Sequence, residues 1–295
     1  GANIPVTVGE QELFLRYIVS PKSVYDRYYN VFSNPFLWFA QHSMWDLSYE
    51  PNIDFSIHDA WERGYVPVNR AFAEAIVDEA ASLDAPPVVM LHDYHLYLVG
   101  AQVRKSLQHA LIQHFIHIPW PSPRHWTIVP QQMREAILES LCSCNIVGFQ
   151  TRQDASNFLL TCQDLLPEAT PDFEARAIHF RGGTTLVRHY PVSIDVPALL
   201  ELADSSEVLG YETRLRSLTL GKAIVRVDRL EPSKNILRGF MAYEMLLGRH
   251  PELLGQVTFL AFLVPSRTDI REYQRYSNDV TDIIRRINST FGRGT

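Results

Sequence analysis

The sequence predicts an α/β protein of two domains, each built on a parallel sheet with covering helices. From residue 87 onward, apolar runs alternate with segments of helical spacing, and this alternation is typical of parallel sheets. A second series of the same kind begins at residue 223. The length of 295 residues also exceeds what one hydrophobic core usually organises. Two domains are therefore expected.

The first series contains three strands and three helices. Apolar runs typical of buried strands occupy residues 86–95, 110–120 and 145–151. The helices that follow them are expected over residues 97–108, 131–143 and 152–166. A small hairpin is expected over residues 172–192, where a glycine pair interrupts alternating residues.

The second series follows a connecting segment. Residues 196–221 are rich in helix formers and acidic residues and contain no strand pattern, so the crossing between the domains is placed there. We assign residues 1–200 to the first domain and residues 201–295 to the second. The elements expected in the second domain are a strand at 223–227, a helix at 236–250, a strand at 257–267 and a helix from Ile270 to Phe291.

Both domains lack parts that a doubly wound fold normally has. The second has only two β–α units, and the first lacks an early β–α unit with a glycine loop. We therefore expect a chain truncated at both ends: either an internal segment of a longer enzyme or a naturally shortened relative.

Composition and charge exclude several classes of function. Hydrophobic residues make up 46% of the chain and charged residues 20%, as in ordinary soluble globular proteins. The net charge of −6 argues against a nucleic-acid surface. No apolar run is long enough to span a membrane, and the N-terminus lacks the layout of a signal peptide. Three cysteines do not suggest a disulfide framework. We expect a cytoplasmic protein without nucleic-acid or membrane partners, and a homo-oligomer remains open.

Ligands of open α/β sheets bind outside the carboxyl ends of the strands. The polar residues expected at strand ends are His92, Asp93, His95, His117, Arg229 and Arg267. The sequence therefore predicts that they face one cleft between the two domains.

The histidine pairs of HDYH (92–95) and HFIH (114–117) resemble metal motifs. Side chains three residues apart at a strand end leave on opposite faces and serve a shared ion poorly, so we expect no metal. His117 has two interpretations, a buried histidine bonded to the backbone or a group at the site. Asp93 has two interpretations, which do not exclude each other: it caps the following helix, or it accepts hydrogen bonds from sugar hydroxyls.

Arg229 and Lys234 lie five residues apart between a strand and a helix start. A helix N-terminus has unpaired N–H groups and a positive partial charge, so this segment suits a phosphate or diphosphate. Ser233 is expected to cap the helix beside Lys234. The alternative interpretation is two solvated surface charges.

Tyr29 and Trp38 lie nine residues apart, with Asn30, Ser33 and Asn34 between them. Each aromatic residue alone is better explained as part of a core. The polar residues between them favour a wall that contacts a carbohydrate.

Six ordered motifs, YYNVFSNPFLW, HDYHL, FIHIPWP, VGFQT, VDRLEPSK and VPSR, resemble the trehalose-6-phosphate synthase family of retaining glycosyltransferases. The resemblance runs from about residue 25 to the C-terminus. It implies a GT-B fold, in which two Rossmann-like domains have parallel sheets that face each other across a cleft. Residues 1–200 would then be the acceptor-side domain, without its first β–α unit. Residues 201–295 would be part of the nucleotide-sugar-binding domain.

The resemblance also implies a reaction and roles. Glucose would pass from a nucleotide-glucose donor such as UDP-, GDP- or ADP-glucose to glucose 6-phosphate, giving trehalose 6-phosphate without a cofactor or metal. The implied catalytic residues are Asp93, His117, Arg229 and Lys234. Arg229 and Lys234 would hold the donor diphosphate, and His117 would lie beside the donor sugar. The implied acceptor ligands are Tyr29, Trp38, Asp93 and Arg267.

The sequence also departs from the family pattern. Asn235 follows Lys234 where the family usually has glycine. The segment FAQHSMWDLSYEPNID after Trp38 looks closer to a divergent bacterial branch that includes glucosylglycerol-phosphate synthases and pseudo-glycosyltransferases. Two alternatives therefore stay open: another phosphorylated acceptor, such as glycerol 3-phosphate or a cyclitol phosphate, and a catalytically silent relative that binds sugar phosphates.

Overall fold

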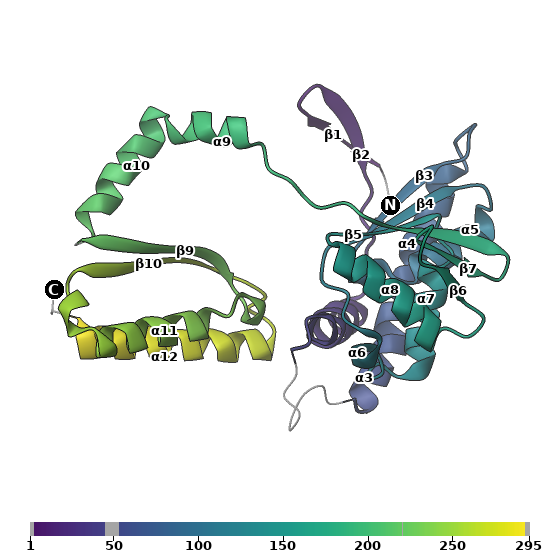
Figure 1. The fold of residues 1–295 in the computed structure, drawn as a ribbon. Helices are drawn as coiled ribbons and strands as arrows, with labels where there is room; N and C mark the ends of the chain where they lie inside the picture. Colours follow the sequence, from purple (N-terminus) through teal and green to yellow (C-terminus); the bar gives the residue numbers. More distant parts are fainter. Residues whose placement is uncertain (1–2, 45–52, 220, 293–295) are drawn as a thin grey trace. The chain divides into compact units, whose positions relative to one another are not determined.

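The fold is that of a computed structural model, which describes residues 3–44, 53–219 and 221–292 (Figure 1). The chain forms two compact units, Gly1–Val192 and Ser193–Thr295. Each unit is described by itself.

A six-stranded sheet with the order β3-β4-β5-β8-β7-β6 forms the centre of the first unit. Its four parallel strands are β3 (Val88–His92), β4 (Leu111–Ile116), β5 (Ile146–Phe149) and β8 (Gly183–His189). The antiparallel strands are β7 (Ala177–Phe180) and β6 (Thr170–Asp172). The three predicted strands and the hairpin are confirmed. The hairpin belongs to the same sheet, because Leu186 of β8 pairs with Ile146 of β5.

Helices that cover this sheet bury its apolar side chains. They are α5 (Val99–Ser106), α7 (Gln131–Leu141) and α8 (Arg152–Leu165), and the short α6 (Pro123–Trp126) packs against α8. The expected helix over residues 97–108 is shorter, because a 3₁₀ turn, η3 (Tyr94–Leu96), comes first. Helix α8 begins at a capping threonine, since the Thr151 side chain accepts a hydrogen bond from the backbone of Asp154. The sheet residues that are fully buried include Ile112, Ile116, Val147, Phe149 and Val187.

A second helical group precedes β3. It consists of α1 (Lys22–Tyr25), the π-helix η1 (Asp26–Leu37), α2 (Trp38–Gln41), α3 (Phe55–Ala60), the π-helix η2 (Trp61–Tyr65) and α4 (Val66–Ala80). The two π-helices pack against each other. Gly64 allows this approach, because a Cβ atom there would lie 2.6 Å from Cβ of Arg27 and 2.6 Å from the backbone nitrogen of Tyr28.

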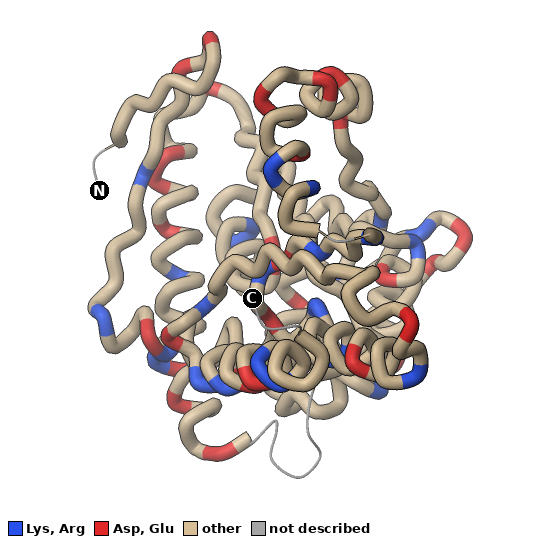
Figure 2. The backbone as a smooth tube through the Cα atoms, turned by 90° about the vertical axis from the view of Figure 1, so that its left-hand side faces the viewer, with Lys and Arg blue, Asp and Glu red and all other residues tan. Residues whose placement is uncertain are grey.

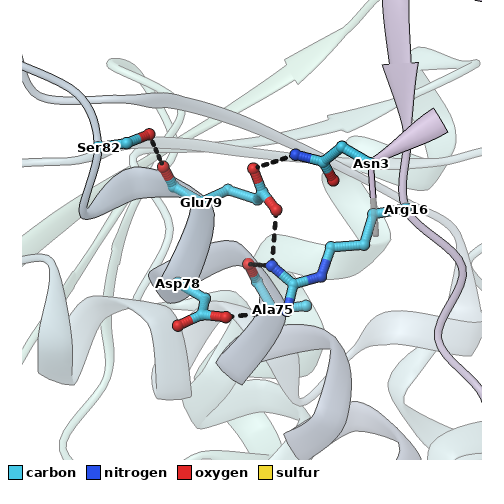
Figure 3. A network of polar contacts seen from close by, with 6 residues as sticks. All are labelled: Asn3, Arg16, Ala75, Asp78, Glu79 and Ser82. Carbon is cyan, nitrogen blue, oxygen red and sulfur yellow. Dashed lines mark hydrogen bonds and ion pairs between the residues drawn. The ribbon is translucent and has the colours of Figure 1, made fainter. Parts of the chain in front are cut away.

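An N-terminal hairpin, β1 (Ile4–Val8) and β2 (Gln11–Leu15), was not predicted. Polar contacts join this part of the chain to α4 (Figure 3). Arg16 donates to Glu79 at 2.6 Å and to Asp78 at 2.9 Å, and Asn3 donates to Glu79 at 3.0 Å. The side chains of the hairpin itself are mostly exposed, so its attachment is largely polar.

The second unit contains two successive β–α units. Helices α9 (Val196–Ala203) and α10 (Ser206–Ser217) lead into β9 (Lys222–Leu230), η4 (Pro232–Lys234), α11 (Ile236–Arg249), η5 (Pro251–Leu253), β10 (Val257–Pro265) and α12 (Arg271–Phe291). Strands β9 and β10 are parallel, and α11 and α12 pack together. The core residues of this unit are Ile236, Phe240, Leu247, Val280, Ile283 and Ile287. The predicted end of the first strand at Val227 is wrong, because pairing continues to Leu230.

Charges are mixed along both units. Figure 2 shows basic and acidic positions interspersed along the tube rather than separated by sign. Within the described ranges, no helix is both long and apolar enough to cross a membrane.

Candidate active site

The carboxyl ends of β3 and β4 bring Asp93 and His117 together in the first unit. The backbone nitrogen of Asp93 donates to the carbonyl of Phe115 at 2.7 Å. The backbone nitrogen of His117 donates to Oδ1 of Asp93 at 3.2 Å. The two residues are therefore linked at one edge of the sheet, as the strand-end pattern predicts.

Asp93 has an unusual backbone conformation, with φ 67° and ψ 175°. Residues other than glycine rarely adopt this region, at a cost of about 1–3 kcal/mol, and such strain concentrates at functional sites. The fully buried His114 supports the strained residue, because its Nε2 atom lies 3.0 Å from the Asp93 carbonyl and must donate to it. The Asp93 side chain makes no cap bond to η3. The helix-cap interpretation is therefore wrong.

Burial shifts both titrating groups toward their neutral forms. It raises the pKa of the Asp93 carboxyl, although the His117 N–H that the carboxylate accepts lowers that pKa. It lowers the pKa of His114 to about 4, although the hydrogen bond to the Asp93 backbone raises it. His114 is thus neutral at physiological pH, with its proton on Nε2.

His117 is exposed and lies beside His92 at the end of β3. Nδ1 of His92 and Nε2 of His117 are 3.0 Å apart. The interpretation of His117 as a buried histidine bonded to the backbone is wrong; that description fits His114. Within the described ranges, no group of three or more metal-ligating side chains could hold an ion.

Tyr29 lies beside the HDYH motif. Its ring stacks on His95, with centroids 5.5 Å apart and planes 15° apart, and on Tyr25 at 5.3 Å. The tyrosine is half-buried. The first unit therefore places the Tyr29 ring against His95, two residues after Asp93.

Trp38 is buried, with 3% of its surface exposed, and its ring lies 4.0 Å from that of His42. Nine residues are about two and a half turns of an α-helix, which would place Tyr29 and Trp38 on opposite sides. The wider π-helical turn of η1 makes the same nine residues about two turns. The π-helix therefore brings both backbone positions to the same side of the axis.

The polar residues between these aromatics serve the fold. Ser33 and Asn34 are fully buried. Asn34 donates to the Tyr29 carbonyl at 3.0 Å and accepts from the Tyr94 hydroxyl at 2.6 Å. The carbohydrate-wall interpretation is wrong for these two residues.

In the second unit, Arg229 lies near the end of β9 rather than beyond it, and 59% of its side chain is exposed. Its Nη2 atom lies 3.2 Å from Oε1 of Glu231. Ser233 donates to the same oxygen at 3.1 Å. The Glu231 side chain is 3% exposed, so a buried carboxylate positions one of the expected phosphate-binding cations. No sequence pattern had indicated Glu231 as part of the site.

The segment that follows has a different cap from the predicted one. Lys234 is exposed in η4, and Asn235 adopts the left-handed conformation (φ 53°, ψ 39°) that asparagine tolerates better than most residues. Ser233 does not cap α11. The Tyr276 hydroxyl accepts from the backbone nitrogens of Ile236 at 2.7 Å and Leu237 at 3.2 Å.

Arg226 is a further cation that the sequence analysis missed. Its Nε donates to Asp228 at 2.9 Å, and its Nη2 donates to the carbonyl of Lys234. It ties β9 to the turn that carries Lys234. The available signal was an arginine inside an otherwise apolar strand.

Arg267 follows β10 at the same edge as Arg229, because Val264 pairs with Arg229. Its Nη1 lies 2.6 Å from the hydroxyl of Tyr273. Burial raises the pKa of Tyr273 to about 12, and Arg267 and Arg229 act in the opposite direction. The cations predicted at two strand ends of this unit thus share one edge of the β9–β10 pair.

A family model, glycosyltransferase family 20, matches residues 7–295. The chain belongs to glycosyltransferase family 20. It is 33% identical to an α,α-trehalose-phosphate synthase [UDP-forming] of Botryotinia fuckeliana, over 90% of this chain and 49% of that protein. It is 34% identical to α,α-trehalose-phosphate synthase [UDP-forming] 2 of Aspergillus niger, over 90% of this chain and 54% of the relative. The chain spans about half the length of these relatives.

Solved structures of trehalose-phosphate synthases have a similar fold. An α,α-trehalose-phosphate synthase (UDP-forming) from Burkholderia xenovorans in complex with glucose-6-phosphate matches with a TM-score of 0.83 and 29% identity. A structure of trehalose-6-phosphate from E. coli bound with UDP-2-fluoro glucose matches with a TM-score of 0.82 and 26% identity. Each match covers 99% of this chain and 62% of the other. The chain therefore has the α/β architecture of the GT-B enzymes.

Proposed function

We propose that the protein transfers glucose from UDP-glucose to glucose 6-phosphate, with retained configuration, to give trehalose 6-phosphate. Membership of family 20 supports the reaction class. The choice of donor is supported by the names of relatives that are described as UDP-forming. The choice of acceptor is supported by the related Burkholderia structure that contains glucose-6-phosphate.

The observation that carries the proposal is the chemistry at the strand ends. Asp93 and His117 are linked at one sheet edge of the first unit, and Arg229 and Arg267 share a sheet edge of the second, where Lys234 follows in the turn. Carboxylates accept hydrogen bonds from sugar hydroxyls, and cations bind phosphates with charge-assisted hydrogen bonds. A sugar phosphate and a nucleotide sugar present these groups.

Each unit would supply a different part of the chemistry. In the second, Arg229 and Lys234 would neutralise the charge that develops on the leaving diphosphate, so that the bond to the anomeric carbon can ionise. Arg267 would bind the acceptor phosphate. In the first, Asp93 would orient the acceptor sugar, and His117 would lie beside the donor sugar. The roles of Tyr29 and Trp38 as acceptor ligands remain predictions.

The test is an assay of the longest natural form of the protein against UDP-, GDP- and ADP-glucose, each combined with glucose 6-phosphate, glycerol 3-phosphate or a cyclitol phosphate. We expect UDP release and trehalose 6-phosphate only from UDP-glucose with glucose 6-phosphate. Proton NMR of the product should show the α,α linkage. If product forms only with another acceptor, that acceptor is the substrate and glucose 6-phosphate is not. If calorimetry shows binding of glucose 6-phosphate but no turnover occurs, the enzymatic function is refuted.

A cytoplasmic location and any homo-oligomer remain predictions. All three cysteines are free thiols in the core, which is consistent with a reducing compartment.

A further inference from the structure

Two imidazoles from neighbouring strand ends face each other at the candidate site. Nδ1 of His92 lies 3.0 Å from Nε2 of His117. The two ring planes differ by 28°, and the centroids are 5.2 Å apart. Because the N–H bond and the lone pair of an imidazole lie in the ring plane, this arrangement suits a direct hydrogen bond.

The contact fixes how many protons the two facing nitrogens hold. One nitrogen must donate and the other must accept, since two N–H groups at 3.0 Å would repel each other. The facing nitrogens therefore share one proton. Nε2 of His117 is hydrogen-bonded to Nδ1 of His92, so Nδ1 is the ring nitrogen that His117 can offer to a ligand.

The surroundings hold the His117 ring in place. Its ring meets Phe115 edge-on at 4.7 Å, and its backbone donates to Asp93. The charged or titratable groups that face the pair are the Asp93 carboxylate, which interacts with His117, and the neutral His114, which interacts with His92. An exposed histidine without such a neighbour samples both tautomers and several rotamers.

We propose that His92 is a positioning residue that fixes the ring orientation of His117 and couples the tautomer of His117 to its own. His117 then offers Nδ1 to a hydroxyl or phosphate oxygen of the sugar substrate. The identity of that ligand rests on the proposed function. The contact between His92 and His117 is seen in the structure and does not depend on that function.

The first measurement needs no activity. Nitrogen-15 NMR of protein labelled at histidine reports which ring nitrogen carries the proton, and the spectrum of His117→Asn identifies the His117 signals. In the wild type we expect the proton on one of the two facing nitrogens, Nδ1 of His92 or Nε2 of His117, and never on both or neither. His92→Phe keeps an aromatic ring but has no hydrogen-bonding atom, so the His117 signals should shift to those of a histidine without this bond. His92→Asn should restore a hydrogen-bonded His117 signal, because an amide can donate or accept.

His109→Asn is the matched control, since His109 is exposed and lies before β4, at the opposite end of that strand from His117. It should leave the His117 signals unchanged. Unaltered signals of the other histidines show that His92→Phe is folded. Protons on both facing nitrogens or on neither in the wild type, or identical His117 signals in the folded His92→Phe protein, would overturn the proposal.

The second measurement is the steady-state rate under the proposed reaction. Loss of one hydrogen bond should lower kcat/KM about tenfold in His92→Phe, and His92→Asn should recover most of the loss. Equal kcat/KM in His92→Phe and wild type would overturn the positioning role even if the tautomer changes. Absence of turnover in the wild type would refute the proposed function instead, and the NMR result would still test the pair.

Discussion

The hydroxyl oxygen of Tyr276 on α12 lies 2.7 Å from the backbone nitrogen of Ile236, the first residue of α11. The side chain of one helix therefore caps the other. Tyr276→Phe should lower the free energy of unfolding of the second unit by about 1 kcal/mol, as for other lost N-terminal caps. Chemical denaturation measures the change. Tyr211→Phe is the control, because Tyr211 is exposed; an equal loss there would contradict the capping role.

Lys234 should matter for catalysis and not for folding, because its side chain is exposed. Lys234→Ala should cost about 2–4 kcal/mol of transition-state stabilisation, measured as a fall in kcat/KM of the longest natural form. Arg238→Ala removes another exposed cation two residues into α11 and should change kcat/KM little. Equal effects of the two substitutions would show that only overall charge matters.

His114 should make the first unit less stable in acid. The pKa of His114 is about 4 in the folded protein and 6.5 in the unfolded chain. At pH values between these two pKa values, the unfolded chain therefore binds more protons than the folded protein. Stability should therefore fall as the pH decreases from 6.5 to 4, by about 3 kcal/mol in total. Urea denaturation across this range measures the slope.

His114→Gln is the informative variant, because glutamine can donate to the Asp93 carbonyl but does not titrate in this range. The difference in stability between the wild type and this variant should shrink or reverse as the pH falls. The raised pKa of Asp93 has the opposite effect on stability, because the folded protein then binds more protons than the unfolded chain as the pH falls. This effect is present in both the wild type and His114→Gln. A pH-independent difference would show that His114 does not titrate as described.

Gly64 should not tolerate a side chain. The Cβ atom of Gly64→Ala would lie 2.6 Å from backbone and side-chain atoms of η1, and relieving this overlap should cost about 1–3 kcal/mol. Gly210→Ala is the matched control, because a Cβ there meets nothing within 4 Å in helix α10. Alanine at 210 should stabilise its helix by up to about 1 kcal/mol. Thermal unfolding of both variants would show whether only the first is destabilised.

The sequence predicted the elements and residues whose signals are local. Apolar runs and helical spacing identified the strands that end at His92, Ile116 and Phe149. Because parallel strands end at one sheet edge, the meeting of Asp93 and His117 followed from their positions alone. The placement of Arg229 and Arg267 at one edge of the β9–β10 pair followed in the same way.

The remaining features depend on contacts between distant residues. The cap of α11 comes from Tyr276, forty residues away, and could not be read from Ser233. The buried acceptor of Arg229 is Glu231, whose burial depends on how the second unit folds. The π-helix η1 packs against Gly64 of η2, and no local sequence pattern indicated it.

The polar attachment of the N-terminal hairpin gives this region its own dynamic behaviour. Since β1 and β2 bury little apolar surface, few contacts oppose their separation from α4. The amide hydrogens of this hairpin should exchange with solvent through local opening events, long before those of β4 and β5. We therefore expect the hairpin to behave as a low-stability foldon attached to a slowly exchanging sheet.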